Sequence, residues 1–326
     1  MAEFTLKNDK LQLTVAEHGA EIRSLIRNAD GREMMWQADP ALWGRTSPVL
    51  FPLVGQYRDK ISYYEGKAYQ MSQHGFARDM DFALVRSTDG WNEDHHLQRE
   101  EQDGEATIPS QNMESQKELW FSLTDSETTH EKYPFAFRLT IGYRLDGDTV
   151  TVCWKVKNTD TKKMYFSIGG HPAFGCDLNH SYLAFEKDGK TVERALTCNV
   201  IEGDGSGCLS DRQKKLELSG GCLALSDELF AEDALIIEDR QADAVTLLDA
   251  EQKRLLTVSF DAPLFGIWSP VGKHAPFVCI EPWYGRCDRV DFGQKLEERE
   301  YGNALESGEE FLVSYRIKIF EELSEL

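Results

Sequence analysis

The stretch RLTIGYRLDGDTVTVCWKVKN, residues 138–158, decides the fold class of this chain. Apolar side chains stand at every second position on both sides of the DGD at 146–148: Leu139, Ile141, Tyr143 and Leu145 before it, and Val150, Val152, Trp154 and Val156 after it. A period of two is typical of a strand with one buried face, and DGD is typical of a tight turn. The stretch therefore predicts an antiparallel β-hairpin.

Alternating runs of the same kind recur at residues 11–15 (LQLTV) and 311–319 (FLVSYRIKI), and no stretch carries a long apolar pattern with a period of 3.6 residues. Many short strands separated by turns are typical of a large antiparallel sandwich. The 326 residues suffice for one large all-β domain or for two ordinary domains. We therefore predict an all-β, antiparallel fold.

The composition narrows the class of partner. Hydrophobic residues make up 41% of the chain and charged residues 28%, and no apolar run reaches the roughly 20 residues of a membrane helix. The formal net charge of −20 makes nucleic acid and anionic membrane surfaces poor partners. We expect no secretory signal, because the start, MAEFTLKNDK, has no basic end followed by an apolar stretch, and the seven cysteines include no CxxC pair. We expect reduced thiols, a cytoplasmic location and a small-molecule ligand.

Residues 89–118 differ from the rest of the chain, because they hold nine acidic and two basic residues and few apolar ones. This composition favours a mobile acidic surface insertion between two strands. The adjacent His95 and His96 lie in it, but nothing nearby in the sequence completes a set of metal ligands. We expect them to be solvated loop residues and expect no metal.

His171 stands at an expected break in a strand, in FSIGGHPAF (166–174). Two glycines before it would let the backbone turn closely beneath a bound molecule, and Pro172 would end the strand, so that the imidazole projects into a cleft. The alternative is a buried structural histidine that is hydrogen-bonded to a carbonyl group.

Glu281 follows the apolar run Phe277–Ile280 in FVCIEPWYGRCD (277–288). We interpret the run as a buried strand that ends at Glu281. A carboxylate there is costly unless it is paired or used. Arg286 could be a structural partner; otherwise Glu281 is suited to general acid–base work.

The other candidate site residues are His74, Arg58, Arg78, Trp268 and Trp283. Each also has a structural interpretation: a histidine that caps a turn, arginines in surface ion pairs, and tryptophans in the core. Taken together, however, imidazole, carboxylate, guanidinium and indole match a sugar, which has an apolar C–H face and a ring of hydroxyl groups.

At these residues the sequence resembles the aldose 1-epimerase (galactose mutarotase-like) family, and within it the LacX-like branch. The resemblance runs in order from about residue 10 to about residue 319. It is carried by GAEIRSL, PVLFPLVG, YYEGKAYQMSQHGFARD, YPFAFRLTIGY, FSIGGHPAF, FAEDALI and APFVCIEPWYGRCD. The combination of HGFAR, GGHPAF and CIEPW is specific. The 89–118 insertion is longer than expected for the branch.

The resemblance implies one β-supersandwich domain over residues 1–326 that interconverts the α and β anomers of free aldoses. It implies no cofactor, and the sequence shows no strand–GxGxxG–helix unit and no P-loop. Matched motif by motif, the resemblance implies that Glu281 is the base and His171 the acid. It implies that His74 donates or accepts a hydrogen bond near the anomeric centre. It also implies that Arg58, or its rival Lys60, binds a sugar hydroxyl and that Asp233 binds the hydroxyls distant from C1.

Two alternatives remain open. An epimerase of hexose 6-phosphates would need two or more basic residues at the distal end of the cleft, which Arg45, Arg58, Arg78 and Arg286 could supply. A sugar-binding protein without turnover is disfavoured because binding alone needs no acid–base pair. We expect a monomer or a homodimer.

Overall fold

The chain folds into antiparallel sheets. The computed structural model describes residues 2–85 and 117–321, so most of the 89–118 insertion lies outside the described residues. No helix in these two ranges is long and apolar enough to span a membrane. Helical structure here is limited to α1 (Glu127–His130) and five short 3₁₀ turns: η1 (Arg58–Lys60), η2 (Ala77–Asp79), η4 (Leu178–His180), η5 (Asp227–Phe230) and η6 (Leu296–Glu298).

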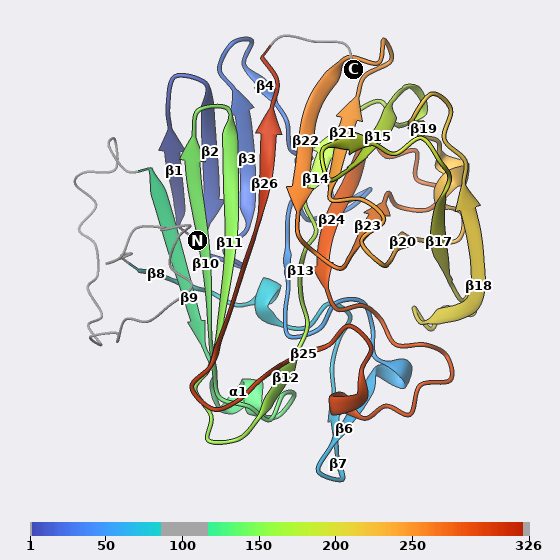
Figure 1. Ribbon diagram of the computed structural model, residues 1–326. Coiled ribbons are helices and arrows are strands. Elements are labelled where there is room, and N and C mark those ends of the chain that lie inside the picture. The colour runs from blue at the N-terminus through green and yellow to red at the C-terminus, as the bar shows by residue number, and fades with distance from the viewer. Residues whose placement is uncertain (1, 86–116, 322–326) are drawn as a thin grey trace.

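One ten-stranded sheet contains the hairpin that the sequence predicts. Its path is β16 (Lys190–Thr191), β15 (Tyr182–Lys187), β21 (Ala244–Leu248), β22 (Arg254–Phe260), β26 (Glu310–Ile319), β11 (Thr149–Asn158), β10 (Phe137–Asp146), β9 (Glu118–Thr124) and β8 (Ala83–Val85), with β19 (Cys222–Ala224) paired to β15. β10 and β11 pair antiparallel, with Leu139 opposite Val156 and Leu145 opposite Val150. The hairpin is confirmed, and Figure 1 shows its strands beside β26 and β9.

A second, eight-stranded sheet carries the residues of interest. Its path is β18 (Leu209–Leu216), β17 (Leu196–Ile201), β20 (Leu235–Ile237), β23 (Leu264–Trp268), β24 (Phe277–Tyr284), β13 (Ile168–Gly170) and β5 (Val49–Leu50), with β14 (Ala173–Gly175) paired to β24. The remaining strands are β1 (Glu3–Lys7), β2 (Leu11–Ala16), β3 (Ile22–Arg27) and β4 (Arg32–Glu33) in one sheet, and the pairs β6 (Ile61–Tyr64) with β7 (Lys67–Gln70) and β12 (Met164–Phe166) with β25 (Asn303–Leu305).

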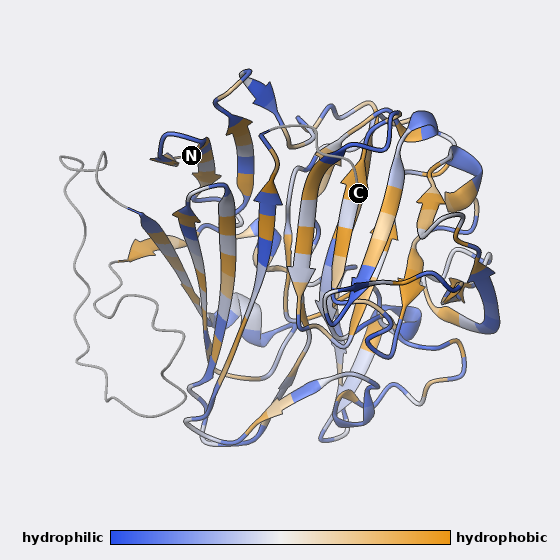
Figure 2. Ribbon diagram, turned by 45° about the horizontal axis from the view of Figure 1, so that its top comes forward, coloured by the Kyte–Doolittle hydropathy of each residue, from blue (hydrophilic) through white to orange (hydrophobic). Residues whose placement is uncertain are grey.

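The main hydrophobic core lies between the three large sheets. It joins Val15 of β2, Val152 of β11 and Ile280 of β24 in one cluster of buried side chains. Figure 2 shows the alternating hydrophobic and hydrophilic bands along the strands that this arrangement requires. The large antiparallel sandwich is therefore confirmed.

Candidate active site

His171 occupies a two-residue interruption between β13 and β14, both of which pair with β24. The interruption is held from the other side by the segment before β5: the His171 N–H donates to the carbonyl of Pro48 at 3.1 Å, and the Ala173 N–H donates to that of Thr46 at 2.9 Å. Because the backbone is fixed on both sides of the break, the imidazole has a defined position over β24.

The two glycines before His171 act differently from the prediction. Gly169 and Gly170 lie inside β13, with no turn beneath them. A Cβ on Gly169 would come within 2.7 Å of the Trp283 ring, and one on Gly170 within 3.1 Å of the Trp154 ring. These positions are glycine because aromatic rings pack directly on the backbone, and the prediction of a turn there was wrong. The break itself falls at His171 and Pro172, as expected.

Glu281 does not end a strand, which corrects a second prediction. β24 continues to Tyr284, and all eight of its residues are buried. Val278 and Ile280 face the main core, so the alternation of a strand turns Cys279 and Glu281 to the opposite face. Apolar cover on both faces hides this alternation in the sequence.

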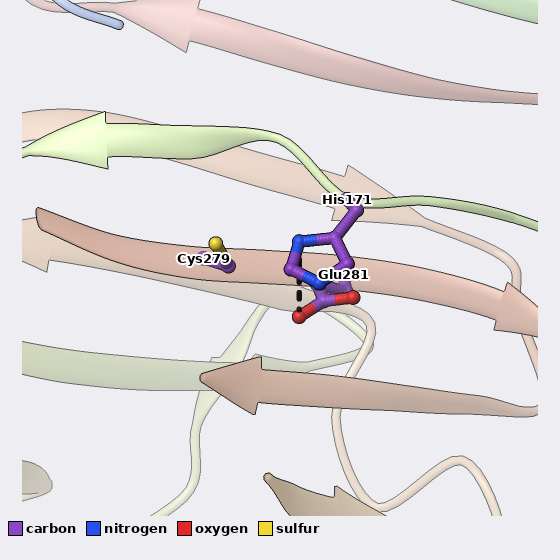
Figure 3. Close-up of side chains that lie close together, drawn as sticks. All are labelled: His171, Cys279 and Glu281. Carbon is purple, nitrogen blue, oxygen red and sulfur yellow. Dashed lines mark ion pairs between the residues drawn. The ribbon is translucent and has the colours of Figure 1, made fainter. Parts of the chain in front are cut away.

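His171 and Glu281 form a buried pair (Figure 3). Nδ1 of His171 lies 3.5 Å from Oε1 of Glu281, and the two residues are only 6% and 1% exposed. Within the described part of the chain, neither Glu281 oxygen nor the His171 Nδ1 has a hydrogen-bond partner of good geometry. Buried polar atoms are nearly always hydrogen-bonded, so this pair is an exception that calls for a functional reason.

His74 lies beside the pair, in a turn after β7. Its backbone is left-handed (φ +66°), and the next residue, Gly75, has φ +75° and packs so closely on the Phe51 carbonyl that a Cβ would lie 2.2 Å from the oxygen. Nδ1 of His74 accepts the Gly55 N–H at 3.1 Å, which leaves the proton on Nε2. The ring meets that of His171 edge-on, with centroids 5.5 Å apart.

Two tryptophans flank the imidazole of His171. Trp43 stacks on it with centroids 4.8 Å apart, and Trp268 meets it edge-on at 5.3 Å. The two indole rings contact each other at 5.5 Å. Both are partly exposed, so an aromatic wall leads from the surface to the buried pair. Trp268 is a candidate from the sequence; Trp43 is not, because WGR at 43–45 lies outside all of the motifs that carry the resemblance.

Burial shifts both members of the pair toward their neutral forms. Burial raises the pKa of the Glu281 carboxyl well above its usual range; the nearby Trp283 indole N–H opposes this and the charge of Asp233 adds to it. Burial, and after it the charge of Arg78, lowers the pKa of His171 to about 3. The pKa of His74 is likewise held well below its usual value, first by burial and then by His171. Burial therefore favours a protonated, neutral carboxyl at Glu281 and an unprotonated, neutral imidazole at His171.

Two arginines act on this site electrostatically. Arg78 and Arg45 both contribute to the lowered pKa of His171. Arg78 is largely buried, and burial followed by the charge of Arg45 lowers its own pKa to about 10. Arg45 is paired with Asp79, whose carboxylate lies 2.6 Å from its Nη2. The local potential is therefore less positive than two free guanidinium groups would make it.

The other sequence candidates lie at different distances from the pair. Trp283 packs in an apolar cluster on the same face of β24, and Asp233 is close enough for its charge to act on Glu281. Arg58 instead donates to the Phe292 carbonyl at 2.9 Å, and none of its described contacts involves the pair. Arg286 is buried in ion pairs with two glutamates, Glu238 and Glu300, and so serves as a structural residue.

A buried carboxylate, Glu21, fixes the wall of the site and is not among the sequence candidates. Its Oε1 accepts the N–H groups of Thr46 at 2.6 Å and Ser47 at 2.8 Å. These residues belong to the segment 43–48, which supplies the stacking indole and the carbonyls that hold the backbone around His171. Glu21 lies in the motif GAEIRSL, but the sequence does not show what its side chain contacts.

Comparison with known proteins shows which proteins this chain is similar to. The family model described as aldose 1-epimerase matches residues 2–317. The plasmid and chromosomal LacX proteins of Lactococcus lactis subsp. lactis are each 29% identical over 303 residues, which cover 90% of this chain and 91% of the relative. The solved structure of a galactose mutarotase related enzyme from Lactobacillus acidophilus gives a TM-score of 0.83 at 31% identity, covering 100% of this chain and 99% of that chain. A galactose mutarotase-like protein from Lactobacillus casei ATCC 334 gives 0.82 at 26% identity, covering 98% and 100%.

Proposed function

Because this chain belongs to the aldose 1-epimerase family, we propose that it interconverts the α and β anomers of a free hexose, with Glu281 as the base and His171 as the acid. The observation that carries the proposal is the buried pair itself: three polar atoms without hydrogen-bond partners within the described chain, at the inner end of an aromatic wall. A sugar supplies what these atoms lack, since its hydroxyl groups donate and accept while its C–H face packs on indole.

The reaction moves two protons. Glu281 takes the proton of the anomeric hydroxyl while protonated His171 gives one to the ring oxygen, and the C1–O5 bond breaks. The aldehyde carbon rotates about the C1–C2 bond and presents its other face. His171 then removes the proton from the C5 hydroxyl as its oxygen attacks C1, and Glu281 returns a proton to the new anomeric oxygen. No net proton is consumed.

Burial favours this transfer. In the ring-open state Glu281 is protonated and His171 is neutral, which is the distribution that burial prefers in the free site. In the ring-closed complex the pair is ionised, and desolvation makes both ions unfavourable. The same burial that disfavours the two charges therefore makes His171 a stronger acid and Glu281 a stronger base toward the bound sugar.

The test is anomer exchange, followed by NMR, with α-galactose and α-glucose above their spontaneous rates. Replacement of Glu281 by Gln or of His171 by Gln should each lower kcat by about 10²- to 10⁴-fold. The matched control is His130→Gln, because His130 also pairs with a carboxylate (Nε2 to Asp125 Oδ2, 2.8 Å) but lies on α1. Glu281→Gln with full activity on the best sugar would refute the assignment.

Glu281→Gln should lose activity without losing stability. A carboxyl whose pKa is raised on folding contributes most stability below its unfolded pKa, and that contribution is lost as the pH rises through the folded pKa. At pH 7, which lies above the ordinary pKa of a glutamate, burial of this carboxyl costs the folded parent free energy, and the neutral amide avoids that cost. A melting temperature at pH 7 at or above that of the parent separates loss of chemistry from loss of fold.

A further inference from the structure

A thiol lies beside the acid–base pair. Nitrogen of His171, Sγ of Cys279 and a carboxylate oxygen of Glu281 all lie within 4.8 Å of one another (Figure 3). Cys279 and Glu281 are two residues apart on β24 and so share a face, and Cys279 is the pairing partner of Ala173, two residues after His171. The backbone pairing of β24 with β14 thus holds the three groups together.

All three groups are free to bind a ligand. Cys279 forms no disulfide and is completely buried. Nδ1 of His171 and both oxygens of Glu281 have no hydrogen-bond partner in the ranges 2–85 and 117–321. Polar side chains that are at least nine-tenths buried and have no hydrogen-bond partner are already desolvated. A ligand that bonds to them therefore gains the full interaction energy without a further cost of desolvation.

The chemistry of the set matches zinc. Thiolate, imidazole and carboxylate are the three ligand types that Zn²⁺ takes in proteins, and three protein ligands with an open fourth position is a common arrangement. Thiolate and carboxylate also cancel the charge of the ion, which a buried site requires, and the protons of the Cys279 thiol and the Glu281 carboxyl are released to solvent when the metal binds. Tetrahedral Zn²⁺ places its ligand atoms about 3.3–3.6 Å apart, so small side-chain rotations bring the three atoms from their present spacing to a fitting one.

We propose that His171, Cys279 and Glu281 form a Zn²⁺ site, and that Zn²⁺ bound there inhibits the enzyme reversibly and in competition with the sugar. Binding of the metal rests on the geometry alone; inhibition rests also on the proposed function. One ion engages the nitrogen of the acid and an oxygen of the base, so neither can exchange a proton with substrate. Arg45 and Arg78 oppose a cation in this site, so its affinity is below that of a four-ligand structural zinc site.

Metal binding is tested with Co²⁺, whose thiolate complex absorbs in the near ultraviolet and whose tetrahedral complex absorbs in the visible. The whole chain should take up one Co²⁺ with both signals, and Zn²⁺ should displace it. Cys279→Ala should abolish the thiolate band. Cys198→Ala is the matched control, because Cys198 is equally buried but lies on β17, outside the cluster, and this variant should keep the band. No thiolate band in the parent, or an unchanged band in Cys279→Ala, overturns the site.

Inhibition is tested on each variant relative to its own uninhibited rate. The Zn²⁺ concentration for half-inhibition should rise by about tenfold or more in Cys279→Ala, since loss of even a residue that supports a ligand costs about 10–100-fold in affinity. It should also rise with sugar concentration, and a chelator should restore activity. Equal inhibition of parent and Cys279→Ala, or inhibition independent of sugar, refutes the competitive mechanism.

Two further outcomes keep the two proposals separate. If Cys279→Ala does not fold, Glu281→Gln replaces it in the Co²⁺ titration and should weaken binding by a similar factor. Co²⁺ binding without any epimerisation would leave the metal site standing and refute the proposed function instead.

Discussion

Replacement of Glu21 should lower the proposed epimerase activity although no described contact joins this side chain to His171 or Glu281. Its Oε1 accepts two backbone N–H groups of the segment 43–48, at 2.6 Å and 2.8 Å. Glu21→Ala leaves both N–H groups buried and unpaired, and each costs about 1–3 kcal/mol, so the total is about 2–6 kcal/mol. Glu21→Gln keeps an acceptor oxygen but loses the charge, which amounts to about 1 kcal/mol per backbone bond, and with it the ion pair between Oε2 and Arg23 Nη1 at 3.4 Å.

The effect on activity follows from what the segment 43–48 holds. It provides the carbonyls that bind the backbone on both sides of the strand break and the Trp43 ring that stacks on His171. A shift of about 1 Å in a catalytic group costs on the order of 10²-fold in rate. We expect Glu21→Ala to lower kcat by about 10- to 100-fold and Glu21→Gln by less, with KM changing less than kcat in both.

The assay measures kcat, KM and thermal stability for Glu21→Ala, Glu21→Gln and a control, Asp249→Asn. One carboxylate oxygen of Asp249 also accepts two backbone N–H groups, both at 2.9 Å, but within the turn between β21 and β22. The control should lose some stability and no activity. Equal kcat for the parent and Glu21→Ala, measured below the melting temperature of both, would refute the positioning role.

Two further predictions concern pH and substrate charge. The profile of kcat/KM should be flat between pH 7 and pH 5, because a proton adds to His171 only as the pH falls toward its pKa of about 3; a steep fall between pH 7 and pH 5 would contradict a neutral His171. A neutral hexose should be preferred to its 6-phosphate, because Arg45 is already paired with Asp79 and Arg286 with Glu238. The test is to measure kcat/KM for galactose, glucose and glucose 6-phosphate at two ionic strengths, and a preference of about tenfold or more for the phosphate at both would overturn the prediction.

Much of the local structure could be predicted from the sequence. The hairpin over 138–158 follows from the alternation of its apolar residues, which are buried on one face of each strand, although Thr151 and Cys153 on the other face of β11 are buried as well. The break at His171 is also expected, since Pro172 lacks the N–H group that a strand donates to its neighbour; Pro282 in the interior of β24 shows that this expectation is not general. Where a strand is covered on both faces the same reasoning fails: every residue of β24 is buried, so its sequence does not mark Glu281 as an interior position of the strand.

The candidate site, too, could be predicted from the sequence only in part. The motifs indicate which residues carry chemistry, and the sequence alone makes His171 and Glu281 candidates. Their separation of 3.5 Å does not follow from the sequence, because the two residues come from distant parts of the chain and meet only through the pairing of β13 and β14 with β24. The choice of Arg58 illustrates the limit: its position after PLVG does not reveal that its guanidinium turns to the Phe292 carbonyl.

The sequence by itself determined the strand periodicity, the family resemblance and the identity of the acid–base candidates, because local alternation and short motifs are properties of neighbouring residues. Only the tertiary structure decided that Trp43 stacks on His171, that Glu21 fixes the wall, and that Cys279 joins the pair. These contacts depend on sheet pairing and on which face of a strand is turned inward. Such long-range geometry also sets the burial that shifts the pKa values of His171 and Glu281 in opposite directions.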